Sequence, residues 1–193
     1  MLSAVFREVP RARLEADAAV CFILDERLCL IYCNPAWDRF ATQNGAPHLC
    51  AESVLDLPVL NSTSGELVDY YKSLYDGALA DRKPQQHDFH CSSAEVERLM
   101  RMFVYPLKAR ALLIVCSLRV EKLHSVPAVE PVEARYRDEH GIMVMCSNCR
   151  RTRRSGVEPE TWDWISEYVA HQPPMVSHSL CDLCLEYYYP DNI

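Results

Sequence analysis

The stretch CFILDERLCLIYCNPAWDRFATQNG, Cys21–Gly45, contains the signals that decide how the first part of this 193-residue chain folds. Two apolar runs, Ala18–Leu24 and Leu28–Cys33, flank a short polar link at Asp25–Arg27. Apolar runs of this length joined by a tight polar turn predict a β-hairpin.

Asn34 and Pro35 end the second predicted strand and begin a helix. Asparagine is favoured at helix N-caps, and proline is favoured at the first helical position. Apolar residues recur at helical spacing at Trp37 and Phe40, so we expect a short helix that stops at Asn44.

Working outward, residues 11–17 predict a short leading helix and Ser64–Ala80 a long one. The expected buried face of the long helix is Leu67, Tyr70, Tyr71, Leu74 and Leu79. Three strands follow, in QQHDFHCSS, EVERLMRMFVYPL and ALLIVCSLRV. The second is expected to bury Leu99, Phe103 and Tyr105, and the third is apolar throughout, as for a strand covered on both faces.

This order of elements resembles the PAS sensor family from about Asp17 to Leu123. The resemblance is carried by the quoted hairpin with its Asn-Pro, by HDFHCSSAEVERLMRMFVYPL, and by ALLIVCSLRVEKL. It implies an α+β fold with a five-stranded antiparallel sheet and flanking helices, and pairing of two copies into a homodimer.

The PAS resemblance does not name a ligand. A flavin-cysteinyl photosensor needs an NCRFLQ-like segment, which is absent, and a haem-binding PAS domain usually has a histidine on the long helix, where this chain has tyrosines. We expect His87 and His90 to lie on a solvated strand face, although either could ligate a cofactor. The remaining cysteines, Cys21, Cys29, Cys33, Cys50, Cys91 and Cys116, are expected to serve as small packing residues.

The strongest chemical motif is a pair of CxxC turns, Cys146-x-x-Cys149 and Cys181-x-x-Cys184, separated by 31 residues. Each turn presents two sulfurs on one side, and two such turns form a tetrahedral four-thiolate site that suits Zn²⁺. His178 is a competing ligand, or it supports a ligand without touching the metal. An iron–sulfur cluster and a thiol-redox pair are the alternatives for these cysteines.

Between the two CxxC turns, ETWDWISEYVAH predicts a helix with Trp162, Ile165, Tyr168 and Val169 on one face. The whole segment resembles a cysteine-rich tail found after PAS or receiver domains in bacterial signalling proteins. The matching positions are Cys146, Cys149, Arg153, Gly156, Trp162, Ile165, Tyr168, Val169, Ser177, His178, Cys181, Cys184, Tyr189 and Pro190. Thr152, Ser179 and Asp182 depart from the family pattern, but every cysteine is kept.

Four arginines, Arg150, Arg151, Arg153 and Arg154, follow the first CxxC turn and raise the question of nucleic-acid binding. Glu158, Glu160, Asp163 and Glu167 come directly after them, and four thiolates around Zn²⁺ carry a formal charge of about −2. We therefore expect the arginines to balance local charge and contact a protein partner, with no nucleic-acid partner.

We expect the protein in the cytoplasm, where thiols stay reduced, because of two features of the sequence. There is no signal-like leader and no apolar run near the roughly 20 residues of a membrane helix, so no membrane partner is expected. The predicted domains are a helical cap at 1–16, the PAS-like domain at 17–120, a linker at 121–140 and the zinc-binding module at 141–193.

No kinase, cyclase or other catalytic motif is present, so we expect a signalling module and not an enzyme. Such a module would act on a separate signalling protein by contact. A zinc-dependent DNA-binding regulator and a thiol-redox sensor are the alternative functions.

Overall fold

The computed structural model describes residues 1–125, 127 and 129–192. Val126 and Ala128 of the predicted linker, and Ile193, lie outside the described residues. The chain forms two compact units, which are described separately below. The first comprises Met1–Ser62, Tyr71–Phe89 and Met100–Arg119, and the second Thr63–Tyr70, His90–Leu99 and Val120–Ile193.

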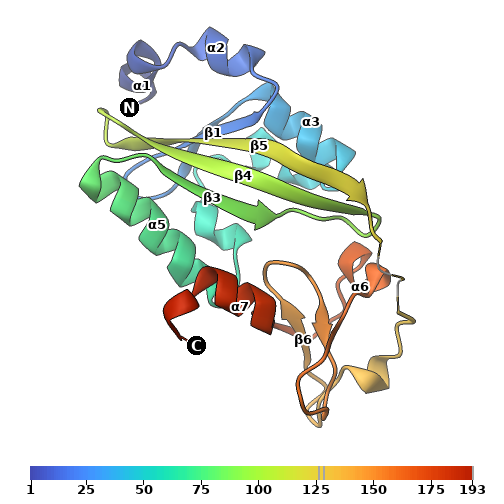
Figure 1. The fold of residues 1–193 in the computed structure, drawn as a ribbon. Helices are drawn as coiled ribbons and strands as arrows, with labels where there is room; N and C mark the ends of the chain where they lie inside the picture. The colour runs from blue at the N-terminus through green and yellow to red at the C-terminus, as the bar shows by residue number, and fades with distance from the viewer. Residues whose placement is uncertain (126, 128, 193) are drawn as a thin grey trace. The chain divides into compact units, whose positions relative to one another are not determined.

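A five-stranded sheet organises the N-terminal two thirds of the chain (Figure 1). Its strands are β1 (Val20–Leu24), β2 (Leu30–Cys33), β3 (Gln85–His90), β4 (Val96–Leu107) and β5 (Ala111–Leu123). They lie in the order β2-β1-β5-β4-β3, with β5 at the centre, and β1 pairs antiparallel with both β2 and β5. This antiparallel sheet with flanking helices confirms the predicted PAS-like α+β fold.

The helices around this sheet are α1 (Leu2–Glu8), α2 (Arg11–Ala16), α3 (Pro35–Gln43), α4 (Ala51–Val54) and α5 (Leu67–Asp81). Short 3₁₀ turns lie at Pro47–Leu49 and Val59–Ser62. The predicted helices at residues 11–17, after Asn34 and at 64–80 are confirmed. Helix α1 lies within residues 1–16, which were predicted as a helical cap without a separate helix at Leu2–Glu8.

Two predicted faces are corrected. In α5 the buried positions are Leu67, Tyr71, Tyr75 and Ala78, while Tyr70, Leu74 and Leu79 are only partly buried. In β4 the buried residues Met100, Met102 and Val104 have the opposite phase from the predicted Leu99, Phe103 and Tyr105, and Leu107 at the end of the strand is also buried. Both sets in β4 are apolar, so alternation alone could not choose between the two faces.

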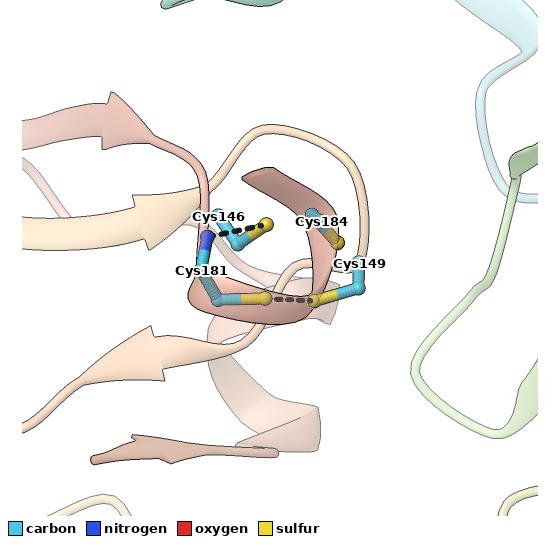
Figure 2. A group of neighbouring side chains, drawn as sticks. All are labelled: Cys146, Cys149, Cys181 and Cys184. Atoms are coloured by element: carbon cyan, nitrogen blue, oxygen red, sulfur yellow. Dashed lines mark hydrogen bonds between the residues drawn. The ribbon is translucent and has the colours of Figure 1, made fainter. Parts of the chain in front are cut away.

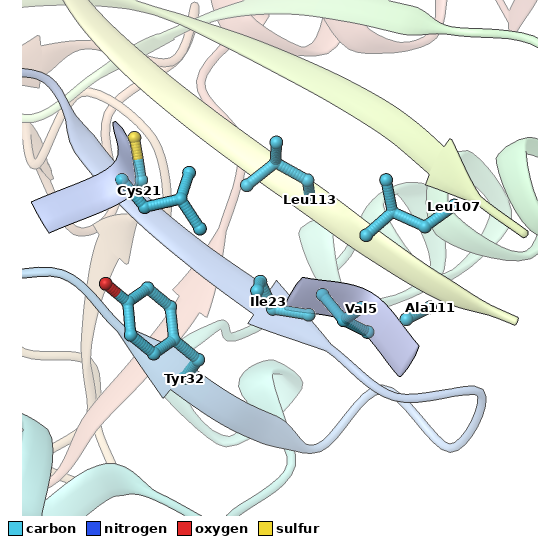
Figure 3. Packing of buried hydrophobic residues seen from close by; sticks show 8 residues of the cluster. Val5, Cys21, Ile23, Tyr32, Leu107, Ala111 and Leu113 are labelled. Atoms are coloured by element: carbon cyan, nitrogen blue, oxygen red, sulfur yellow. The ribbon is translucent and has the colours of Figure 1, made fainter. Parts of the chain in front are cut away.

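Helix α1 packs on one face of the sheet (Figure 3). Val5 of α1 packs in a buried cluster with Ile23 of β1 and Leu113 of β5. The neighbouring positions Leu112 and Ile114, which point to the other face, are buried as well. The prediction that β5 is covered on both faces is therefore confirmed for Ala111–Cys116, whereas Leu118, Val120 and Leu123 further along the strand are exposed.

Asn34 is the polar centre of the hairpin region and is only 1% exposed. Its Oδ1 accepts hydrogen bonds from the Cys21 amide at 3.0 Å and the Trp37 amide at 3.3 Å, the second being the predicted N-cap bond of α3. Its Nδ2 donates to the carbonyls of Leu14 at 3.0 Å and Ala19 at 2.9 Å. One side chain thus joins α2, β1 and α3.

The C-terminal part of the chain forms a small second sheet in the order β8-β7-β6-β9. Its strands are β6 (Met143–Cys146), β7 (Thr152–Arg153), β8 (Trp162–Asp163) and β9 (Val176–Ser179). This part of the chain also contains two helices, α6 (Ser166–Ala170) and α7 (Asp182–Tyr188), and 3₁₀ turns at Glu133–Arg135 and Pro190–Asn192. We call residues 129–192 the cysteine module.

The long helix predicted between the CxxC turns is wrong in extent, because Trp162 lies in a strand and α6 has only five residues. Ile165 and Tyr168 are nevertheless buried in the core of the module with Tyr136, Met143 and Met145. Tyr136 falls in the segment predicted as a linker and is 1% exposed.

Over the part of the chain that the structure describes, every helix falls short of the length and apolar character required to cross a lipid bilayer.

Candidate metal centre

The two CxxC turns are brought together by pairing of their strands. Cys146 ends β6 and Cys181 follows β9, and these strands are parallel neighbours with Cys146 opposite Ser179. Because paired parallel strands end at the same edge of a sheet, both turns emerge side by side. The sheet pairing therefore accounts for contact between cysteines that lie more than 30 residues apart.

Each turn then folds back on itself. In the first, the Cys146 amide donates to the Arg151 carbonyl at 2.8 Å, and the Arg150 amide donates to the Cys146 carbonyl at 3.1 Å. Arg150 adopts a φ of 65°, which closes the turn tightly. In the second, Cys181 caps α7 and Cys184 lies in the first turn of this helix.

The four cysteine sulfurs converge on one point (Figure 2). All four lie within 4.8 Å of one another, and the sulfurs of Cys149 and Cys181 are 3.6 Å apart. The Cys181 amide donates to the Cys146 sulfur at 3.5 Å, which orients the first turn against the second. Cys146, Cys181 and Cys184 are buried, and Cys149 is half-buried.

This geometry fits a single metal ion. Sulfurs placed about 2.3 Å from a tetrahedral zinc are separated from each other by about 3.8 Å, close to the observed spacing. A disulfide needs sulfurs about 2.05 Å apart, and all four cysteines are free. In a four-iron cluster each thiolate binds a different iron, so the sulfurs would not converge on one centre. The set therefore suits one ion held by four thiolates.

The arrangement also favours a thiolate. Hydrogen bonds to the Cys146 sulfur from Cys149, Cys181 and Cys184 lower the pKa of the Cys146 thiol far below its usual range, whereas the contact with Cys146 raises the pKa of the Cys149 and Cys181 thiols. A deprotonated sulfur is the form that binds metal.

Sequence reasoning missed Asn148, which lies inside the first CxxC turn and is 8% exposed. Its Nδ2 donates to the Cys184 sulfur at 3.3 Å. Its Oδ1 accepts from the His90 amide at 3.2 Å and from the Tyr188 hydroxyl at 3.1 Å. All three partners are distant in sequence, so no local pattern could have identified this residue.

The histidines considered as ligands lie in different places. His178 lies on β9 opposite Met145 and is not part of the four-cysteine group; burial and the nearby Arg150 lower its pKa. The expectation of a solvated face is wrong for His87, which is buried against Tyr71 with ring centres 5.7 Å apart. Burial lowers the pKa of His87 to about 4. His90 is half-buried, and burial also lowers its pKa.

Two of the four arginines are neutralised by the acidic residues that follow them. Arg154 makes a two-pronged ion pair with Asp163, at 2.6 and 3.0 Å, and Arg153 pairs with Glu160 at 2.8 Å. Asp163 also accepts from the Tyr136 hydroxyl at 2.8 Å, inside the module core. Arg150 is exposed and Arg151 half-buried. The pairs stabilise the module and reduce the positive charge that nucleic acid would meet.

The other six cysteines are also free thiols. Burial raises the pKa of Cys21 to about 11 and that of Cys33 to about 12. Such thiols are inert at neutral pH, which agrees with their expected role in packing.

Together, the fold and the site define a PAS-like α+β protein with a C-terminal four-cysteine cluster. No protein-family model matches the chain, and no curated protein sequence matches it.

Comparison with solved structures returns PAS domains at low sequence identity. One is the PAS domain of nitrogen regulation protein NR(II) from Vibrio parahaemolyticus, with 17% identity over 57% of this chain and 98% of that chain and a TM-score of 0.39. A domain of a sensory box sensor histidine kinase/response regulator from Geobacter sulfurreducens has 14% identity over 57% of this chain and 91% of that chain, with a TM-score of 0.43. The PAS domain of the Cronobacter turicensis quorum-sensing receptor RpfR, in complex with C12:0, has 13% identity over 54% of this chain and 96% of that chain, with a TM-score of 0.43.

Proposed function

We propose that this protein is a bacterial cytosolic signalling module, in which a PAS-like sensor is joined to a structural zinc module. The convergence of four cysteine sulfurs within 4.8 Å of one another carries the metal part of this proposal. The residues that hold the ion are Cys146, Cys149, Cys181 and Cys184, and the PAS-like fold supports the sensory part.

The zinc has a structural role. Four thiolates complete the tetrahedral coordination of the ion and leave no position open for a substrate or a water nucleophile. The cysteine module has a core of few buried side chains, so the ion supplies stability that apolar burial alone would not. A protein of this kind acts by contact with a partner, without catalysis, and as a homodimer.

Native mass spectrometry of the freshly purified full chain tests the metal, the oligomeric state and any retained PAS ligand together. We expect one zinc per chain, and Cys149→Ser should lose it while strands β1 and β2 of the five-stranded sheet keep their hydrogen-exchange protection. Cys50→Ser, outside the cluster, is the matched control and should retain the metal. A chain isolated with four reactive thiols and no metal would refute the zinc module and favour the thiol-redox alternative.

The DNA-binding alternative is tested by titration with duplex DNA at low salt. Since Arg153 and Arg154 are already paired with carboxylates, we expect no complex. Tight binding that weakens steeply with added salt would overturn the assignment to protein contact.

A further inference from the structure

The cysteine cluster is connected to two segments that precede it by more than 45 residues in the sequence. The compact unit that holds the cluster also includes Thr63–Tyr70, which runs into the start of α5, and His90–Leu99, at the turn between β3 and β4. Both segments make named contacts with the module.

Asn148 makes the first connection. The His90 backbone N–H can only donate, so the side-chain oxygen of Asn148 must face it, and the amide nitrogen then faces the Cys184 sulfur. A metal-bound thiolate is an acceptor that matches this amide donor. The orientation of Asn148 is therefore set by a backbone donor on one side and by a metal ligand on the other.

Tyr188 extends this connection to α5. Its hydroxyl donates to Asn148 at 3.1 Å, and its ring packs edge-on against Tyr70 with ring centres 4.8 Å apart. Tyr188 belongs to α7, the helix whose first turn contains Cys184. Displacement of Cys184 would thus disturb both the Asn148 amide and the helix that carries Tyr188.

The segment before α5 is held independently at Gly65 and Glu66. A Cβ on Gly65 would lie 2.9 Å from both the His178 carbonyl oxygen and the Ser147 hydroxyl, so the backbones approach as closely as only glycine permits. The Ser179 hydroxyl donates to the Glu66 carboxylate at 3.0 Å. Ser147, next to Asn148, is thus within contact distance of the segment that starts α5.

We propose that Asn148 is a positioning residue that makes the order of Thr63–Tyr70 and of the His90 amide depend on metal occupancy of the cluster. This inference rests on the metal site proposed above. The bound ion fixes the Cys184 sulfur, Cys184 and the His90 amide fix Asn148, and Asn148 holds Tyr188 against Tyr70. Release of the ion frees the first turn of α7, and the start of α5 loosens with it.

The consequence for signalling follows from chain continuity. Helix α5 runs without a break from Leu67 to Asp81, and its part after Tyr70 carries Tyr71 and Tyr75, which are buried and belong to the first compact unit. When the first turn of a helix frays, the helix becomes shorter, and a shorter helix is less stable because helix formation is cooperative. The metal state of the cysteine module therefore influences the longest helix of the sensor.

Hydrogen exchange of the full chain, followed by mass spectrometry with and without a zinc chelator, tests this proposal. In the wild type, chelation should speed exchange at least tenfold in peptides covering Thr63–Tyr70 and at the end of β3. In Asn148→Ala with zinc still bound, these peptides should already exchange fast, and chelation should change them less than twofold. Ser177→Ala, at an exposed position on β9, is the matched control. Its ratio of the exchange rate after chelation to the rate with zinc bound should equal that of the wild type.

A second variant covers the case in which Asn148→Ala does not hold zinc. Tyr188→Phe removes the hydroxyl that reaches Asn148 and keeps the ring on Tyr70. The ratio of the exchange rate after chelation to the rate with zinc bound should therefore be at least threefold lower in Tyr188→Phe than in the wild type. An unchanged ratio in Tyr188→Phe, or in zinc-bound Asn148→Ala, would overturn the role of Asn148. Fast exchange confined to β6 and β9 after chelation of the wild type would overturn the coupling and leave the zinc module intact. Absence of metal from the purified wild type would instead refute the proposed function itself.

Discussion

Replacement of Asn34 by alanine should destabilise the PAS-like unit more than any other single polar substitution in the hairpin region. The side chain makes five hydrogen bonds, to the amides of Cys21 and Trp37 and to the carbonyls of Leu14, Asp17 and Ala19. Loss of the helix-capping bond to Trp37 costs about 1 kcal/mol. Each of the three shortest bonds adds about 1 kcal/mol, because the Cys21 amide and the Ala19 carbonyl lose a partner in a buried site and the Leu14 carbonyl keeps only its longer bond from the Asp17 amide, at 3.3 Å.

The expected loss is therefore about 4 kcal/mol, a large fraction of the roughly 5–15 kcal/mol by which domains are stable. With a urea m-value of about 2 kcal/mol per molar, the unfolding midpoint should fall by about 2 M. Far-UV circular dichroism across a urea titration measures this shift. Asn61→Ala, at an exposed position, is the matched control and should move the midpoint by no more than about 0.3 M.

An Asn34→Ala midpoint within about 0.5 M of the wild type would refute the argument that this side chain holds α2, β1 and α3 together. Asn34→Asp separates the two halves of the side chain. It keeps an oxygen for Cys21 and Trp37 but turns a second oxygen toward the Leu14 and Ala19 carbonyls. It should destabilise at least as much as alanine, and near-wild-type stability of this variant would show that the donated bonds contribute little.

Three further changes give separate outcomes. Gly65→Ala should lower the free energy of unfolding by at least about 2 kcal/mol and lower the melting temperature of the metal-loaded protein, because φ is +59° there and a Cβ meets the His178 carbonyl. The control Gly77→Ala, which has open space around it inside α5, should raise the free energy of unfolding by about 0.5–1 kcal/mol. Equal effects of the two changes would contradict the close approach at Gly65. Arg154→Ala should lower the melting temperature, because Asp163 loses its ion pair. Arg154→Lys should recover only part of this loss because lysine lacks the two-pronged geometry, and full recovery in thermal melts would show that charge alone matters. His87→Gln should make the free energy of unfolding depend less on pH. The folded pKa of about 4 lies below the unfolded value of about 6.5, so the contribution of neutral His87 is complete above pH 6.5 and is lost as pH falls from 6.5 toward 4. Urea titrations across this range measure the change, and the control His48→Gln, at an exposed position, should behave like the wild type.

The sequence predicted those parts of the fold that local signals control. The Asn34–Pro35 pair gave the start of α3 because capping and proline geometry act within one turn of helix. The CxxC spacing indicated the cysteine cluster because each turn places two sulfurs together whatever the rest of the chain does. The apolar runs of the strands are also local signals, and they were sufficient to predict the order of the strands along the chain.

The errors fall where the outcome depends on what covers a residue from elsewhere. β4 carries large apolar side chains on both faces, and α1 packs on one face of the sheet, so alternation could not show which set is the more deeply buried. His87 was expected in solvent but is buried against Tyr71, because the sequence does not say which side of β3 faces α5. Asn148 gave no signal because its partners come from β3 and α7.

Asn34 and Asn148 show why a buried amide side chain can organise segments that apolar packing does not specify. Each uses its oxygen and its nitrogen on opposite sides, so its orientation is correct only when every partner is in place. All partners of Asn34 are backbone groups, and that centre is complete once the PAS-like unit is folded. One partner of Asn148 is the Cys184 sulfur, whose position a metal ion would fix. The other partners of Asn148 are the backbone of β3 and a tyrosine that packs on the start of α5. In our proposal, the hydrogen bonds of Asn148 to these partners therefore depend on whether a metal ion is bound.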